Sequence, residues 1–444
     1  MRRMKFTLFV LLFTGLNVFG QFTFDETDAG VVDGGLGMSW IDGEPYYTFQ
    51  FRPEISVGKF GMGLDLNLEF NSDGLRTENF NSFSDYLSVI RYVRYGRRYD
   101  PYYIRVGALD YASLGYGNVM YMYNNSPSFD ARTIGMNFKL DFDVMGVEGV
   151  YSDFSQAGVL AVRGFIRPLK FTSLGSVPII GGLTFGITYA NDMQKYAGVL
   201  KGYYDSADDK IIVDEDYGNV QIGSIDVGLP IFKNNVVNWE LYYTYTKILD
   251  AGDGQSYGTL LGLDFRIVDV KIKFERNINN PQYMPSYFNA THEIDRYKVV
   301  GDSVVTKYAL LQNLDESGAN GYYGGLMIDV LGAFKILGSY QRMDKVDHSG
   351  MLNLYSQITP ETAPVVIKAG YSKTHIDKES ELFKLDDRSL FFVEAGYKPY
   401  PFLIVSLVYK WTFTPIRGIN DEIIDFEPQK KIEPRISFVY PFNM

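Results

Sequence analysis

The chain has 444 residues, a formal net charge of −11 and a mean hydropathy of −0.10. The acidic balance argues against nucleic-acid binding, which needs a basic footprint. There is no cysteine, which excludes disulfides and cysteine-based metal sites. Beyond residue 20, no apolar stretch reaches 18 residues, so a bundle of membrane-spanning helices is excluded too.

Residues 1–20 have the pattern of a secretory signal peptide. The start is basic, an apolar run follows from Phe6 to Phe13, and small residues that suit a cleavage site stand at 18 and 20. The run is too short to cross ~30 Å of hydrocarbon as an anchor. We expect cleavage before Gln21 and a short periplasmic segment over 21–35.

The clearest strand is the stretch from Phe60 to Phe70. Apolar side chains stand at every even position and Gly, Asp, Asn or Glu at every odd one, which is the period of a strand rather than a helix. Eleven residues at ~3.3 Å each, tilted by about 40–45°, span a ~25 Å apolar band. We therefore expect a wall strand with lipid on one face and a wet interior on the other.

The same alternation recurs along the whole chain. It is clear over 133–143, 237–246, 268–275 and 402–412, and weaker over 35–41, 46–57, 86–95, 102–109, 147–154, 158–166, 182–190, 220–229, 257–265, 322–330, 333–342, 364–373, 389–397 and 434–442. The total predicted is about 16 strands, with a range of roughly 14–20. No fixed-period repeat points to a propeller or solenoid.

The predicted connections alternate in length. Short ones fall at 56–59, 97–100, 144–146, 266–267 and 332, and long polar ones at 71–85, 110–131, 191–219, 276–320, 374–388 and 414–433. This rhythm is typical of membrane barrels with short periplasmic turns and long external loops. It is unusual in a soluble sandwich, where loops longer than about 12–15 residues are uncommon.

The last strand adds a resemblance. Ile436, Phe438, Tyr440 and Phe442 alternate with other residues, much as in the aromatic-rich terminal strand by which outer-membrane barrels are handed to the barrel-assembly machinery; Pro441 and the two residues after Phe442 depart from that pattern. Through its pattern, the mature chain resembles bacterial outer-membrane β-barrel proteins of porin-like type. The end of the signal peptide resembles those of Bacteroidota.

The resemblance implies an all-β protein: a transmembrane antiparallel up-and-down β-barrel over 36–444, located in the cell outer membrane. Fifteen residues before the first strand leave no room for the plug domain of a TonB-dependent receptor. Expected partners are outer-membrane lipids, the assembly machinery and small solutes, with no cofactor or metal. The oligomeric state is left open.

The lumen and the loops are the candidate functional parts. Strand parity predicts pore-lining side chains at Asp65, Asn67, Glu69, Arg105, Lys139, Asp141, Glu240, Asp269, Lys271, Lys273, Glu275 and Lys410. Basic and acidic walls that face each other across the channel would select charged solutes. Four more arginines lie nearby: Arg97 and Arg98 are expected in a solvated turn, while Arg91 and Arg94 have opposite parity and need a bulge to share the lumen.

Two long segments are candidates to narrow the lumen. Residues 110–131 form either an inserted constriction loop or an external loop packed on its neighbours; its candidate constricting residues are Tyr111, Tyr116, Met120, Tyr121 and Tyr123. Segment 276–320 is the longest candidate lid. The acidic runs over 205–216 lack calcium-loop spacing and are expected to be solvated.

These features predict a porin-like channel for passive passage of small polar or charged solutes. The alternatives are a structural or adhesive surface barrel and a barrel-embedded hydrolase. Catalysis is disfavoured because His292, His348 and His375 all fall in expected loops, without a strand-borne serine and carboxylate beside them.

Overall fold

The computed structural model describes residues 30–76, 86, 89–98, 100–126, 133–177, 179–314, 320–359, 363–418 and 423–442. The expected signal peptide lies outside the described residues. The first strand begins at Gly30, which is earlier than the start near residue 36 that the sequence indicated.

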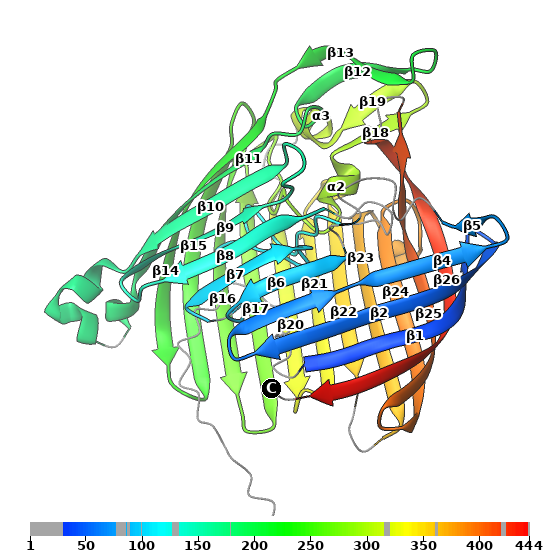
Figure 1. Cartoon of the computed structure of the whole chain (residues 1–444). Coiled ribbons are helices and arrows are strands. Elements are labelled where there is room, and N and C mark those ends of the chain that lie inside the picture. The colour runs from blue at the N-terminus through cyan, green and yellow to red at the C-terminus, as the bar shows by residue number, and fades with distance from the viewer. Residues whose placement is uncertain are drawn as a thin grey trace, which may run out of the picture.

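The described chain folds into one large antiparallel sheet that closes on itself (Figure 1). Its strands are β1 Gly30–Ile41, β2 Glu44–Val57, β3 Phe60–Leu64, β4 Leu66–Asn71, β5 Gly74–Leu75, β6 Ile90–Tyr95, β7 Tyr102–Gly107, β8 Gly135–Asp141, β9 Met145–Tyr151, β10 Val159–Ile166, β11 Thr184–Asp192, β14 Val220–Lys233, β15 Val237–Ile248, β16 Asp253–Asp264, β17 Val268–Asn279, β20 Gly321–Val330, β21 Phe334–Met343, β22 Gly350–Ile358, β23 Val365–Ile376, β24 Ser389–Tyr400, β25 Leu403–Arg417 and β26 Ile423–Phe442. The first and last strands pair from Gly30–Phe442 to Ile41–Lys431, which removes the sheet edges.

The wall has 20 strands rather than about 16. The sheet contains 22 strand segments, but β3 and β4 both pair with β2 and continue one wall strand, and β5 is a two-residue return on β4. An even number of wall strands is usual for bacterial outer-membrane barrels. The strand that the sequence reading missed is β22, where apolar and polar side chains occur on both faces of Met351–Ile358.

The two faces of the wall differ in chemistry. Large apolar side chains such as Leu36, Ile187, Phe274 and Leu407 are exposed on the outside. The neighbouring positions in each strand point inward, and many of them are buried polar or charged residues. An apolar band outside and polar groups inside match a barrel whose outer solvent is hydrocarbon.

The connections at one barrel end are mostly short, as at 58–59, 142–144, 265–267, 331–333 and 401–402, and those at the other end are long. Two predictions need correction. Much of 414–433 belongs to β25 and β26 rather than to a loop. Connection 167–183 is long although it lies at the short-turn end, and it contains 3-10 turns η2 Pro168–Phe171, η3 Ser173–Ser176 and η4 Ile180–Gly182.

A small second sheet lies above the long-loop end (Figure 1). It contains β12 Val199–Asp205, β13 Lys210–Asp216, β18 Tyr297–Val300 and β19 Ser303–Thr306, and the short helices α2 His292–Asp295 and α3 Lys307–Gln312 flank it. A further 3-10 turn, η5 Glu379–Glu381, lies between β23 and β24. None of the described helices is long and apolar enough to cross a membrane.

Candidate functional site: the barrel lumen

The predicted pore-lining residues all lie on the lumen side of the wall. Antiparallel partners share a face, so Arg105 opposite Asn137, and Lys139 opposite Glu148, have the same orientation. The lumen side is identified by contact with an inserted loop, described below, which touches Glu240. Their role in lining a conducting pore remains a prediction.

Charged residues of the lumen pair mainly with near neighbours. Lys273 Nζ lies 3.4 Å from Glu275 Oε2 on the same strand, and Lys271 Nζ lies 3.5 Å from Asp269 Oδ2. Arg105 Nη2 lies 3.2 Å from Asp110 Oδ2. The interpretation of one basic wall opposing one acidic wall is therefore replaced by local pairs of opposite sign, which balance charge inside a partly dehydrated lumen.

The barrel is closed at a seam where side chains reach across β1. The inward positions of β1 are mostly small, including Gly35 and Gly37, so β26 side chains extend over them to β2 and β4. Lys431 pairs with Glu69 of β4, and Arg435 Nη1 donates to Gln50 Oε1 of β2 at 2.8 Å. The seam thus links Glu69, a predicted pore-lining residue, to the last strand.

The bulge that Arg91 and Arg94 need in order to share the lumen is present, and Arg98 is the member of the arginine cluster that departs from the expectation. The register between β3 and β6 shifts at Gly63/Leu64, and this irregularity lets Arg91 reach Asp110 while Arg94 stays buried on the lumen side. Arg98 does not merely face water, because its guanidinium donates to the carbonyls of Asp110 and Tyr111. These bonds join the turn before β7 to the loop after it.

Residues 108–126 fold into the lumen rather than over the rim. Tyr116 is the central contact: its hydroxyl donates to Glu240 Oε1 at 2.6 Å, and its ring stacks on Tyr242 with 4.1 Å between centroids. Asn118 Nδ2 donates to Ser256 Oγ at 2.7 Å. Of the two readings of this loop, the inserted one agrees with these contacts; residues 127–131 lie outside the described range.

Two glycines make room for this packing. A Cβ at Gly228 would overlap the Tyr116 hydroxyl, and a Cβ at Gly258 would overlap the ring of Tyr242. Both glycines occupy inward positions of wall strands. The close approach of Tyr116 to the wall therefore depends on the missing side chains.

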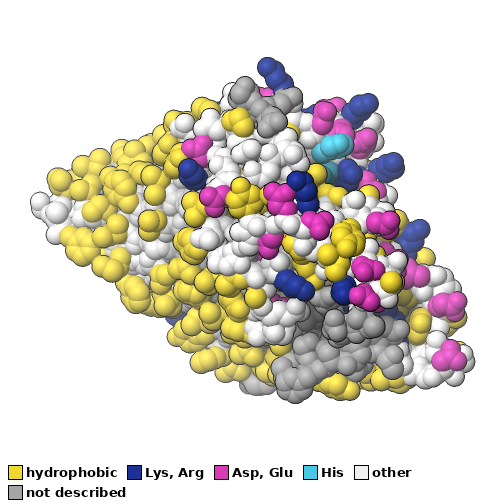
Figure 2. Space-filling model, turned by 90° about the horizontal axis from the view of Figure 1, so that it is seen from above, with side chains coloured by type: hydrophobic (Ala, Val, Ile, Leu, Met, Phe, Trp, Pro, Cys, Tyr) yellow, Lys and Arg dark blue, Asp and Glu magenta, His cyan; other side chains and the backbone are white. Residues whose placement is uncertain are grey.

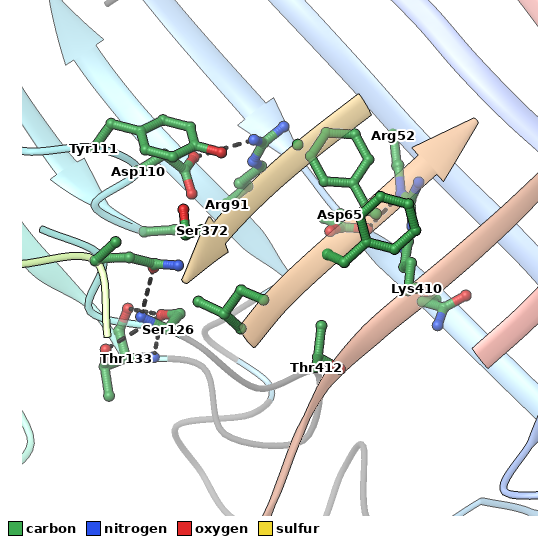
Figure 3. Close-up of a pocket in the computed structure, with 18 of the residues that line it drawn as sticks. Arg52, Asp65, Arg91, Asp110, Tyr111, Ser126, Thr133, Ser372, Lys410 and Thr412 are labelled. Carbon is green, nitrogen blue, oxygen red and sulfur yellow. Dashed lines mark hydrogen bonds and ion pairs between the residues drawn. The ribbon is translucent and has the colours of Figure 1, made fainter. Parts of the chain in front are cut away.

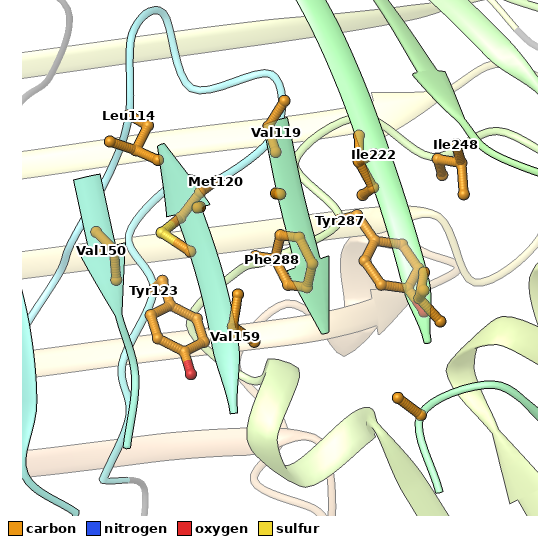
Figure 4. Close-up of a cluster of buried hydrophobic side chains, with 14 of the residues drawn as sticks. Leu114, Val119, Met120, Tyr123, Val150, Val159, Ile222, Ile248, Tyr287 and Phe288 are labelled. Carbon is orange, nitrogen blue, oxygen red and sulfur yellow. The ribbon is translucent and has the colours of Figure 1, made fainter. Parts of the chain in front are cut away.

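A second inserted segment, from about residue 280 to Arg296, packs on the first. Tyr121 N donates to Phe288 O at 2.9 Å, and Ser286 N donates to Asn118 O at 2.7 Å. Figure 4 shows the apolar cluster between them and the wall, which includes Met120 and Phe288. Part of segment 276–320, the candidate lid, therefore fills the lumen, and the rest of the described segment belongs to the small outer sheet and its helices.

A buried charged cluster fastens this second segment. His292 Nε2 lies 2.9 Å from Asp192 Oδ2, which also accepts from Arg296 Nε at 2.9 Å. Burial lowers the pKa of His292 to about 4, so the ring is neutral near pH 7. Burial also lowers the pKa of Lys307 to about 8, and its ammonium donates to Tyr287 O at 2.6 Å.

The histidines do not form a hydrolase triad in the described part of the chain. His292 Nδ1 has no hydrogen-bond partner there. His348 Nδ1 pairs with Asp377 at 2.9 Å on the exposed side, and His375 Nδ1 contacts the neighbouring Thr374 hydroxyl. A triad needs a nucleophile, a base and an orienting carboxylate in line.

A cavity of ≈ 360 Å³ remains between the inserted loop and the wall formed by β2, β4 and β23–β25 (Figure 3). Arg52 Nε pairs with Asp65 Oδ1 at 2.7 Å, and Arg91 Nη2 pairs with Asp110 Oδ2 at 3.1 Å. Lys410 also lines this cavity. Strand parity could have found Arg52, since it alternates with Phe51 and Pro53, whereas Arg91 depends on the bulge.

Two polar atoms at this cavity are buried without a protein partner. They are Asn67 Oδ1 and Thr412 Oγ1. Buried polar groups in native proteins almost always have a hydrogen-bond partner, from the protein or from water. Both atoms are enclosed by protein, so the polar character of the cavity comes from its charged lining, Arg52, Asp65, Arg91, Asp110 and Lys410.

Closure of the sheet, the outward apolar band and the polar lumen together define a porin-like β-barrel protein of the outer membrane. Closed barrels satisfy every wall backbone group inside hydrocarbon, which an open sheet cannot do. In this chain, the inserted loop of residues 108–126 narrows the lumen. Class and location follow from this geometry.

No protein family matches the chain, and no curated protein matches it either. Among solved structures, Pseudomonas aeruginosa OccK11 (OpdR) has 10% identity and a TM-score of 0.32, with 94% of this chain and 96% of that chain covered. Acinetobacter baumannii OccAB2 has 9% identity and a TM-score of 0.29, with 94% and 98% covered. At TM-scores this low, the class rests on the barrel's own geometry.

Proposed function

We propose that the protein is a porin-like channel for passive passage of small polar or charged solutes. The route runs beside the inserted loop, through the cavity bordered by Arg52, Arg91 and Lys410. The single observation that carries the proposal is this cavity inside a closed barrel, lined by charged side chains.

The size of the barrel supports the proposal. Barrels of 16–18 strands leave an aqueous channel, so a wall of 20 strands encloses more space than its own side chains fill. The two inserted segments occupy part of that space. A narrow residual passage fits small solutes better than proteins or large chelates.

The charges at the cavity support a mild preference for anions. Its lining contains three cations, Arg52, Arg91 and Lys410, and two carboxylates, Asp65 and Asp110. The local balance is therefore positive although the whole chain is acidic. Rings of charged side chains select the opposite charge in other pores.

Liposome swelling tests the proposal. Liposomes that contain the purified protein should swell in isotonic solutions of small neutral and anionic solutes, and faster than protein-free liposomes. The control is the same protein heat-denatured before reconstitution. Swelling no faster than that control would favour the alternative, a structural or adhesive surface barrel.

A further inference from the structure

The connection between β10 and β11 differs from the other connections at its end of the barrel. The turns beside it, at 142–144 and 234–236, contain three residues each, whereas this one extends over 167–183. From Phe171 to Leu183 its sequence has no charged residue. A tight turn would be enough to join β10 and β11, so a long and uncharged periplasmic connection indicates an additional role.

Large apolar side chains of this connection are exposed. Phe171 is 58% exposed and Leu174 is 46% exposed, and three more join them at Val177, Ile179 and Ile180. Scattered exposed apolar residues are ordinary, but a contiguous patch marks a surface that meets another apolar phase.

Much of the described backbone of the connection is hydrogen-bonded within the connection itself. Successive 3-10 bonds run from Thr172 N to Leu169 O, from Gly175 N to Thr172 O, from Val177 N to Leu174 O and from Leu183 N to Ile180 O, all at 3.0–3.1 Å. The hydroxyls of Thr172 and Ser176 donate to carbonyls three residues earlier. Such internal pairing is what a bilayer demands of a segment that enters it.

The connection starts at the lumen side of the wall and projects outward from the barrel. In Figure 1 it projects sideways from the ends of β10 and β11, and Figure 2 shows hydrophobic side chains gathered toward that end of the molecule. Gly182 packs against Pro230 of β14, whose register partner is the inward-facing Glu240, so the inner edge of the connection lies at the lumen side of the wall. Phe232, which is exposed on the outside of the wall, lines a pocket together with Gly175 and Gly182 of the connection, and the exposed Phe185 is the second residue of β11.

Charged residues occur only at the base of the connection. Arg167 Nη1 pairs with Asp141 Oδ1 at 2.8 Å, and Lys170 pairs with Asp143. The ion pairs hold the base against the end of β8, where Asp141 lies, and against the turn that follows it, which contains Asp143. The apolar part beyond them is therefore presented in a fixed direction.

We propose that the described residues 168–177 and 179–182 form an interfacial anchor that inserts into the periplasmic leaflet of the outer membrane. The partner is the lipid surface itself, because the exposed apolar patch continues the apolar band of the wall. An apolar face at the level of the headgroups typically sinks about 5–10 Å into the boundary of the acyl chains. The anchor is independent of whether the lumen conducts.

The absence of cysteine in the chain makes spin labelling a direct test. Phe171→Cys, Leu174→Cys and Ile180→Cys would each carry one nitroxide label in the full-length protein, reconstituted into phosphatidylethanolamine–phosphatidylglycerol vesicles. Ile187→Cys, on the exposed outer wall, is the lipid control, and Tyr217→Cys, exposed beside the outer sheet, is the water control.

Power-saturation EPR then compares collisions with oxygen, which concentrates in lipid, and with a water-soluble nickel chelate. The anchor predicts that the oxygen-to-nickel ratio at all three sites resembles that of Ile187→Cys and exceeds that of Tyr217→Cys. A ratio like that of Tyr217→Cys would overturn the proposal. Protection from both reagents would also overturn it, since a protein surface, such as a second copy of the chain, would then cover the patch.

Discussion

Replacement of Leu66 by arginine tests the orientation of the wall, and the adjacent Asn67 provides the matched control. Leu66 lies opposite Phe51 near the middle of the wall strand formed by β3 and β4, and its side chain points outward. Asn67 points inward, where its amide donates to Glu69 Oε1 at 3.0 Å. Leu66 faces lipid and Asn67 faces the polar lumen, and the two positions are otherwise closely matched.

The expected cost follows from that difference. Arginine on the lipid face near the bilayer midplane costs about 2–4 kcal/mol. A loss of about 3 kcal/mol lowers the folded-to-unfolded ratio by roughly 150-fold, at 1.4 kcal/mol for each factor of ten. Asn67→Arg places its charge beside Glu69 and Asp65 in a polar cavity, so a change below about 1 kcal/mol is expected.

Guanidinium unfolding in lipid vesicles, followed by the heat-dependent shift in electrophoretic mobility, measures both variants. The midpoint for Leu66→Arg should fall well below that of the wild type, while that of Asn67→Arg should stay close to it. Equal midpoints for the two variants, or a larger loss for Asn67→Arg, would show that the faces are assigned the wrong way round.

Three further predictions concern the lumen. Tyr116→Ala removes the hydrogen bond to Glu240 and the stacking on Tyr242, so single-channel conductance should rise. Tyr217→Ala, on the outer side, should leave the conductance unchanged. If Tyr116→Ala does not raise the conductance, the loop does not narrow the path. Lys410→Gln removes one of three cations at the cavity, so the reversal potential in a salt gradient should shift toward cation preference. An unchanged reversal potential would mean that ions do not pass through this cavity. Burial lowers the pKa of His292 from 6.5 to about 4, so its contribution to stability is complete above pH 6.5 and is lost as pH falls toward 4. The free energy of unfolding should therefore differ less between pH 7 and pH 5 in His292→Gln than in the wild type. Equal differences in the two proteins would show that His292 is not the cause.

Strand periodicity carried most of the information about the wall. Wherever one face met lipid and the other met polar groups, as in Phe60–Phe70, alternation identified both the strand and its faces. It missed β22, because Leu352 and Leu354 on the outward face alternate with Met351 and Tyr355 on the inward face. Asn353 and Gln357 share the inward face, and Ser356 shares the outward one, so apolar and polar side chains occur on both faces and the pattern loses contrast.

The contents of the lumen were less accessible from the sequence. The aromatic, glycine-containing composition of 110–131 raised insertion as one of two readings, but the contact of Tyr116 with Glu240 joins residues 124 positions apart. Segment 280–296 has no strand period, and its packing partner is the other inserted loop rather than the wall alone. Long-range packing of irregular segments leaves no periodic signal for a single sequence to display.

Bulges and ion pairs are the other features that parity alone could not give. The inward reach of Arg91 follows from the register shift between β3 and β6. The link between Asp192 and His292 joins β11 to a helix 100 residues later, and depends on burial that only the folded lumen provides.

The most direct test of the central claim, that the constricted lumen conducts small solutes, is a single-channel recording of purified protein in a planar bilayer. The account predicts discrete conductance steps in potassium chloride, with larger steps for Tyr116→Ala under the same conditions. A folded barrel, verified by circular dichroism, that produces no steps in either form would contradict it.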